Sequence, residues 1–143
     1  MKQYHTDIII NASAEAVWQE LNNFAAYASW NPLISHLEGD IREGGIIKAN
    51  IVPLKQTMRA QLMVYKPNEE LTWEGKLLTS SLLCVRHYYQ LKSISPTQTH
   101  LLHGETFTGL AAFFIPKSLL NKMEKVFIEH NLRLKSRLEQ TSI

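Results

Sequence analysis

One long amphipathic segment ends the chain, and it limits the folds that are open to the protein. Beyond Pro116, a residue well suited to the first turn of a helix, apolar side chains recur at three- and four-residue steps, and charged side chains cover the other faces. The apolar stripe consists of Leu120, Met123, Phe127, Leu134 and Leu138, with Asn131 among them. The pattern predicts a helix of about 25 residues, roughly 37 Å long, which can lie across the whole concave face of a twisted sheet.

The rest of the chain is typical of antiparallel strands. Alternating apolar and polar residues between turn-forming glycines, prolines and asparagines predict six strands, and the β-branched run at 8–10 predicts another near the N-terminus. We expect the strands at 3–11, 34–40, 46–52, 56–66, 71–78, 83–93 and 98–108. Ser13 is a suitable cap for a first short helix, and a second helical turn follows before Pro32. The predicted class is α+β, in the order β-α-α-β6-α.

Length and composition exclude several classes of protein. A chain of 143 residues is long enough for one well-buried core, so we expect a single domain over 1–143. The formal charge is only +2 and its signs are interspersed, which argues against a nucleic-acid partner. Every apolar run is far shorter than the ~20 residues of a spanning helix, so no membrane span is predicted.

The cysteine and histidine content bears on compartment and cofactors. Cys84 is the only cysteine, so no disulfide can form within the chain, and the N-terminus lacks the apolar core of a secretion signal. A cytoplasmic protein is therefore predicted. The six histidines do not follow the spacing of a metal site, and no nucleotide-binding glycine motif is present. We predict neither a metal nor a cofactor.

The last two predicted strands carry polar residues on their inner faces. Alternation places His87 and Tyr89 on one inner face and His103 and Glu105 on the next. A tight turn between the strands would bring His87 opposite Glu105, and Tyr89 opposite His103. Buried polar groups need partners. The His87–Glu105 pair is thus interpreted as a structural hydrogen bond, as a polar anchor for a ligand, or as a general acid/base couple.

Large apolar and aromatic side chains on the same faces are candidates for the wall of a pocket. They are Trp30, Met58, Trp73, Phe107, Met123 and Phe127. Each is also compatible with ordinary core packing. Together with His87, Tyr89, His103 and Glu105, they form the predicted ligand-binding set, in which His87 and Glu105 are also the candidates for catalysis.

Six sequence motifs follow one another along the chain in a characteristic order. They are Ala-Ser-Ala-Glu-Ala-Val-Trp at 12–18, Trp-Asn-Pro at 30–32, Leu-x-Trp-x-Gly at 71–75, Arg-His-Tyr-Tyr at 86–89, Glu-Thr-Phe-Thr-Gly at 105–109 and Asn-x-x-Leu-Lys at 131–135. In this order they resemble the signatures of the START / polyketide-cyclase / coenzyme-Q-binding superfamily (SRPBCC).

The resemblance implies a helix-grip fold, in which a curved seven-stranded antiparallel sheet wraps around the C-terminal helix and encloses an apolar cavity. The chain departs from the family pattern at Cys84 and Val85, where related sequences tend to have a glycine. This departure leaves the conformation of the loop at 78–83 open, close to the expected mouth of the cavity.

Three functions are compatible with these features. The leading hypothesis is a binding protein for a small hydrophobic or amphipathic molecule, such as a lipid, a polyketide or a quinone-like compound. The first alternative is an enzyme of the polyketide cyclase/dehydratase or hydrolase type that uses His87 and Glu105 as its acid/base pair. The second is a protein-interaction module with an incidental cavity. Both a monomer and a homodimer are compatible with the sequence.

Overall fold

The elements of the fold follow the predicted order. The structure is a computed structural model that describes residues 2–77, 79 and 81–140. In chain order the elements are β1 (Lys2–Ile10), α1 (Ala14–Leu21), η1 (Phe24–Ala26), α2 (Tyr27–Trp30), β2 (Ile34–Gly39), β3 (Ile46–Ile51), η2 (Val52–Leu54), β4 (Gln56–Lys66), β5 (Glu70–Leu77), β6 (Leu83–Ser95), β7 (Gln98–Thr108), η3 (Leu110–Phe114) and α3 (Lys117–Gln140). The η elements are short 3-10 turns.

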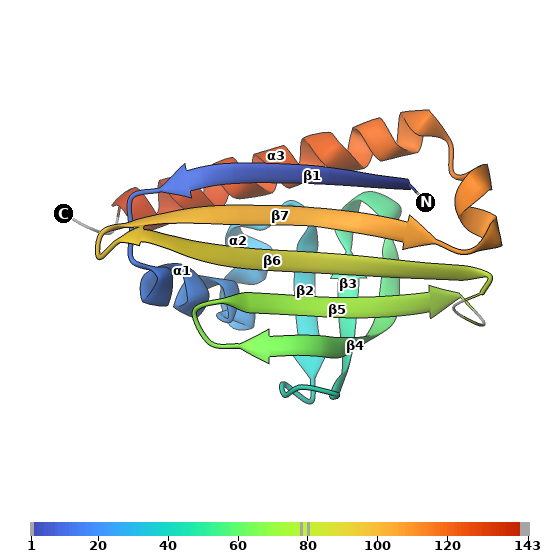
Figure 1. The fold of residues 1–143 in the computed structure, drawn as a ribbon, viewed down its shortest axis with the longest axis horizontal. Helices are drawn as coiled ribbons and strands as arrows, with labels where there is room; N and C mark the ends of the chain where they lie inside the picture. The colour runs from blue at the N-terminus through green and yellow to red at the C-terminus, as the bar shows by residue number, and fades with distance from the viewer. Residues whose placement is uncertain (1, 78, 80, 141–143) are drawn as a thin grey trace.

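The strands form one antiparallel sheet with the spatial order β1-β7-β6-β5-β4-β3-β2. The sheet curves so strongly that β2 and β3 run across the direction of β5, β6 and β7 (Figure 1). The long helix α3 runs alongside β1 and packs chiefly against it. Helices α1 and α2 contact both α3 and the sheet at one end of the molecule. The predicted α+β helix-grip fold, with seven strands and a long C-terminal helix, is confirmed.

Side chains at helix ends explain how the chain leaves β1 and enters β2. The Ser13 hydroxyl accepts a hydrogen bond of 3.1 Å from the backbone N–H of Ala16, as expected of a helix N-cap. After α2, the side-chain oxygen of Asn31 accepts hydrogen bonds from the backbone N–H groups of Leu33 and Ile34, each at 2.9 Å. The Trp-Asn-Pro motif therefore turns the chain from α2 into β2.

A β-bulge in β4 overturns one prediction about inner faces. Strict alternation predicts that Val64 lies on the same inner face as Leu62. The register of β4 against β5 shifts between these two residues, so Tyr65, not Val64, pairs with the buried Leu71. The extra residue of a bulge reverses the faces beyond it. Tyr65 consequently points inward, with its ring centroid 5.3 Å from that of Trp18.

The loop at 78–83 is described in part, because Leu78 and Ser80 lie outside the described residues. Its end packs against the turn that follows β7, where the Ala111 N–H donates a hydrogen bond of 2.8 Å to the Leu82 carbonyl. Gly109 has a φ of 100° there, and a Cβ atom would lie 2.6 Å from the Leu82 carbonyl oxygen. The glycine of the 105–109 motif therefore permits this close approach of two backbones.

Candidate functional site

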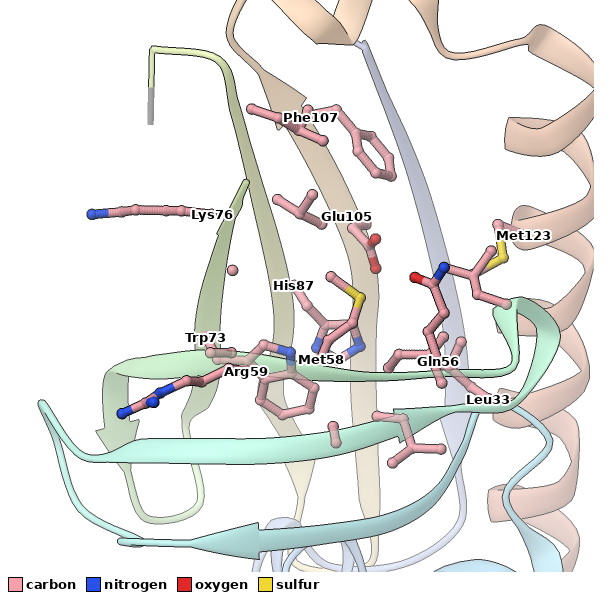
Figure 2. Close-up of a pocket in the computed structure, with 18 of the residues that line it drawn as sticks. Leu33, Gln56, Met58, Arg59, Trp73, Lys76, His87, Glu105, Phe107 and Met123 are labelled. Carbon is pink, nitrogen blue, oxygen red and sulfur yellow. The ribbon is translucent and has the colours of Figure 1, made fainter. Parts of the chain in front are cut away.

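A cavity of about 340 Å³ lies between the concave face of the sheet and the N-terminal half of α3 (Figure 2). Its size is at the lower end of the range for small-molecule sites. Six members of the predicted ligand-binding set line it: Met58, Trp73, His87, Glu105, Phe107 and Met123. In Figure 2 the Glu105 carboxyl group projects from β7 into the space that Met123 faces from α3.

Most of the remaining wall was not predicted as a site. It comes from β2 to β6, from η2 and the residue before β2, and from the junction of η3 with α3. It comprises Leu33, Ile34, Ala49, Ile51, Leu54, Gln56, Arg59, Ala60, Gly75, Lys76, Leu83, Val85, Ile115, Leu119 and Leu120. Alternation places Ala60 on the same inner face as Met58, although Ala60 was not predicted as a site residue. The residues from β2, β3 and η2 carry no local signal, because only the curvature of the sheet brings them beneath α3.

Four predicted pocket residues, Trp30, Tyr89, His103 and Phe127, are absent from the described cavity lining. They belong instead to the solid core beside it. The His103 ring lies between the rings of Tyr89 and Phe127, with centroid distances of 4.3 and 4.2 Å and nearly parallel planes. Trp30 packs against His130 of α3 at a centroid distance of 5.1 Å. These aromatic contacts fill the space that a ligand would need.

The strand pairing aligns one row of side chains across four strands. Glu105 on β7 pairs with Tyr4 on β1 and with His87 on β6, and His87 in turn pairs with Trp73 on β5. The predicted register, with His87 opposite Glu105 and Tyr89 opposite His103, is thus the one found in the sheet. Tyr4 was missed by the sequence analysis, because nothing in the sequence of β1 indicates which residue it meets.

His87 and Glu105 face each other in the register but do not form the expected hydrogen bond. The His87 ring stacks on Trp73, with a centroid distance of 4.1 Å and an interplanar angle of 15°. In this orientation its Nε2 lies 2.8 Å from Nε2 of His103, the diagonal neighbour on β7. The polar partner of His87 is therefore another histidine, and the Glu105 carboxyl group is left beside the cavity.

A buried hydrogen-bond network joins His103 to the C-terminal half of α3. The side-chain oxygen of Asn131 lies 2.8 Å from Nδ1 of His103 and 3.1 Å from Nδ1 of His130. The Asn131 nitrogen lies 2.8 Å from the Thr6 hydroxyl, and the Tyr89 hydroxyl lies 2.9 Å from Nε2 of His130. The network thus connects β1, β6, β7 and α3 around the fully enclosed rings.

One backbone group fixes the direction of every hydrogen bond in this network. The His103 carbonyl oxygen can only accept, so the Thr6 hydroxyl, 2.6 Å away, donates to it. Thr6 has no second hydrogen, so the Asn131 amide nitrogen donates to the Thr6 oxygen. The Asn131 oxygen then accepts from Nδ1 of both His103 and His130. Each neutral ring therefore has its proton on Nδ1 and accepts through Nε2.

This direction determines the state of His87. Because Nε2 of His103 accepts, Nε2 of His87 donates to it. A neutral His87 ring then has no proton on Nδ1. Nδ1 is buried and has no hydrogen-bond partner among the described residues. An unsatisfied acceptor in a cavity wall is a group that a ligand can use.

Burial shifts the pKa values of these groups in opposite directions. It lowers the pKa of His130 to about 4, and burial together with His130 lowers the pKa values of His87 and His103 well below the usual range. Burial raises the pKa of Glu105 to about 8. The site is therefore uncharged near neutral pH, with three neutral imidazoles and a protonated carboxyl group.

Tyr4 and Glu105 influence each other across β1 and β7. Burial and the Glu105 carboxyl group raise the pKa of the Tyr4 hydroxyl, whereas this hydroxyl offsets part of the rise in the pKa of Glu105. The Tyr4 hydroxyl thus interacts with the Glu105 carboxyl group, and its oxygen is buried with no other hydrogen-bond partner among the described residues. Glu105 lines the cavity, is neutral near pH 7 and can donate a hydrogen bond to a third group, whereas Tyr4 is absent from the described lining.

The cavity wall also contains a glycine, which leaves space where a side chain would lie, and two cationic side chains. Gly75 lines the cavity, and a Cβ atom there would lie 3.4 Å from the Arg59 carbonyl oxygen and 3.7 Å from the methyl group of Met58. The side chains of Arg59 and Lys76 extend away from Glu105 in Figure 2.

Among the described residues, no group of three or more His, Cys, Asp and Glu side chains is arranged to hold a metal ion.

Comparison with known proteins assigns this architecture to a family. The family described as polyketide cyclase / dehydrase and lipid transport matches the sequence over residues 1–139. The chain belongs to this family. No curated protein matches its sequence significantly.

Solved structures that resemble this polyketide cyclase family member share its fold at low identity. A START superfamily protein from Mycobacterium smegmatis is 17% identical with a TM-score of 0.73, covering 98% of this chain and 99% of that chain. The ZhuI aromatase/cyclase from Streptomyces sp. R1128 is 12% identical with a TM-score of 0.70, covering 97% and 94%. A hypothetical protein from Helicobacter pylori is 13% identical with a TM-score of 0.77, covering 95% and 87%. The relationship to the SRPBCC superfamily predicted from the motifs is confirmed.

In the described part of the chain, no helix combines the length and the apolar character that crossing a bilayer requires.

Proposed function

We propose that this protein binds a small hydrophobic or amphipathic molecule in the cavity between the sheet and α3. The observation that carries the proposal is the cavity itself, about 340 Å³ in volume and lined mainly by aliphatic, aromatic and methionine side chains. Burial of an apolar ligand there would gain about 25 cal/mol per Å² before the costs of association. The lipid-transport part of the family description supports this proposal.

Ligand uptake can be tested directly on the full chain. We expect the protein, gently purified from its host, to release a small molecule when native and denaturing mass spectra are compared. The emptied protein should bind naphthalene, measured by displacement of an apolar fluorescent probe. Failure to release or bind any apolar molecule would refute the proposal.

A matched pair of variants locates the binding event. Ala60→Leu adds a larger side chain to the cavity wall, whereas Ala28→Leu makes the same change at an exposed position of α2. Ala60→Leu should weaken naphthalene binding severalfold, and Ala28→Leu should leave it unchanged. Equal affinities for both variants would place the ligand elsewhere.

A second candidate is an enzyme of the polyketide cyclase/dehydratase or hydrolase type. It is favoured by one observation, the protonated Glu105 carboxyl group opposite a His87 ring that has an unprotonated Nδ1. An acid and a base that face one apolar cavity are the components of proton-transfer catalysis. The aromatase/cyclase with the same fold supports this candidate by analogy alone.

Substitution of His87 separates the two candidates. A carrier should keep most of its affinity for naphthalene after His87→Gln, because apolar contacts dominate binding. An enzyme should lose turnover by a factor of about 10² or more when its base is removed. The hydrolase version can be followed as release of 2-naphthol from 2-naphthyl acetate. A rate equal to that of the buffer would eliminate ester hydrolysis.

A further inference from the structure

Two cavity-lining residues of one cross-strand row carry polar groups with unused hydrogen-bonding capacity. They are the Glu105 carboxyl group and Nδ1 of His87. Glu105 can donate, and Nδ1 of His87 can only accept, since its tautomer is fixed through His103, Asn131 and Thr6. The rest of the described lining is mainly apolar, and its other amide or charged side chains are Gln56, Arg59 and Lys76.

From this arrangement we propose that the cavity selects a neutral ligand whose polar end is a hydroxyl group. The hydroxyl hydrogen is donated to Nδ1 of His87, and its oxygen accepts from the Glu105 carboxyl group. The inference rests on the proposed binding function and adds the chemistry of the ligand. An alcohol or a phenol satisfies both directions at once, whereas an ether or a ketone can only accept.

The charges around the site argue against an anionic ligand. His87 is 3% exposed, and the groups that face it are the neutral His103 ring, the Trp73 and Tyr89 rings, Phe127 and the Glu105 carboxyl group. The cationic lining residues, Arg59 and Lys76, point away from this row (Figure 2). An ionised carboxylate would lose its hydration here without gaining a cation, and it would face the lone pair of His87.

The unsatisfied lone pair on Nδ1 of His87 favours the binding of a ligand that carries a hydrogen-bond donor. A buried acceptor that lacks a donor costs stability, and a ligand hydroxyl removes this cost when it binds. The gain exists only for the donor-bearing ligand. Selectivity therefore comes from the polar row, while general affinity comes from the apolar wall.

Four bicyclic probes of similar shape test this on the unmodified protein. We would measure the affinities of 2-naphthol, 2-methoxynaphthalene, naphthalene and 2-naphthoate by isothermal titration calorimetry at pH 7. One hydrogen bond to an otherwise unsatisfied group predicts that 2-naphthol binds about fivefold to tenfold more tightly than 2-methoxynaphthalene. Ionised 2-naphthoate should bind most weakly.

Nitrogen-15 NMR provides a readout that does not depend on affinity. The Nδ1 resonance of His87 should have the shift of an unprotonated imidazole nitrogen, and Nε2 that of a protonated one. Addition of 2-naphthol should move the Nδ1 resonance toward the protonated range, and 2-methoxynaphthalene should not. A proton found on Nδ1 in the free protein would overturn the inference.

Variants at Glu105 test the other half of the interaction. Glu105→Gln retains a donor and should keep the preference for 2-naphthol, whereas Glu105→Leu should reduce it. Glu69→Leu, the same change at an exposed turn, is the control and should have no effect. If naphthalene and 2-naphthol bind equally well, the inference fails and the binding function stands. If 2-naphthoate binds most tightly, the inference also fails; if none of the probes binds, both fail.

Discussion

The two halves of α3 face interiors of opposite character. The C-terminal half, with His130 and Asn131, packs against the His103 and Trp30 rings and joins a hydrogen-bond network. The N-terminal half, with Leu120 and Met123, faces an apolar cavity. The polar half is therefore the solid one, and the apolar half is the hollow one.

This difference shows how a small domain can hold a cavity. Apolar packing alone would draw α3 onto the sheet along its whole length, because close-packed interiors leave few voids. Hydrogen bonds have fixed lengths and directions, so the network of Asn131 sets where the helix lies relative to β1 and β7. Once one half of the helix is fixed, the other half can stand away from the sheet.

The largest expected effect comes from removing the centre of the network. Asn131→Leu leaves the Thr6 hydroxyl and the Nδ1–H groups of His103 and His130 without their partner. We expect the free energy of unfolding to fall by about 3–5 kcal/mol, because several buried polar groups lose their hydrogen bonds together. Urea denaturation followed by circular dichroism measures this change.

The control for this variant lies on the exposed side of the same helix. Asn121→Leu makes the same change at a solvent-exposed position of α3, and it should alter stability by no more than about 0.5 kcal/mol. Similar losses of unfolding free energy in both variants would mean that the network does not hold the helix in place. The proposed difference between the two halves of α3 would then be wrong.

The ionisation of Glu105 and that of the buried histidines should change the stability of the fold with pH in opposite directions. Burial raises the pKa of Glu105 to about 8 in the folded protein, from the ordinary glutamate pKa of 4.5. The folded state binds the extra proton between these values, so this group's contribution to stability is complete at low pH and is lost as the pH rises. Relative to the parent, Glu105→Gln should therefore become more stable between pH 4.5 and 8.5, by roughly 2–4 kcal/mol.

The three buried histidines respond in the opposite direction. The pKa values of His87, His103 and His130 are lowered, so their stabilising contribution is present above the unfolded value of 6.5 and is lost as the pH falls. The parent and Glu105→Gln should both lose this contribution in acid, as measured by urea titrations across pH. A parent–variant difference that does not change with pH would contradict the protonated state of Glu105.

A smaller effect is expected from filling the hollow half. Ala60 lines the cavity, whereas Ala112 of η3 is buried but absent from its described lining. Ala60→Leu should keep or raise stability, by up to about 1 kcal/mol, because it extends into empty space. Ala112→Leu should cost about 1–3 kcal/mol through overpacking. Thermal unfolding of the two variants checks the difference, and equal losses would indicate that the cavity closes in solution.

The fold was predictable because its signals are local and periodic. Period-two alternation identified the strands, and the stripe from Leu120 to Leu138 identified α3. The turn between β6 and β7 gave the correct pairing of His87 with Glu105. Alternation failed where β4 bulges near Val64, since a bulge has no fixed sequence signature.

The site was predictable only in part, because its key contacts join distant segments. Asn131 was visible as a polar residue on an apolar stripe, but its partners lie on β1 and β7. Likewise, Tyr4 reaches Glu105 only through the pairing of the first and last strands. The single-domain organisation, the cytoplasmic location and the choice between monomer and homodimer stay predictions.

Gly75 has a consequence for how this cavity can evolve. It is a wall residue in a regular strand, and the contacts that a methyl group would make there are at ordinary or nearly ordinary van der Waals distances. Any glycine codon becomes an alanine codon by one nucleotide change. A lineage can therefore reduce the volume of the cavity in a single mutational step, and the hydrogen-bond network around Asn131 is not touched by that change.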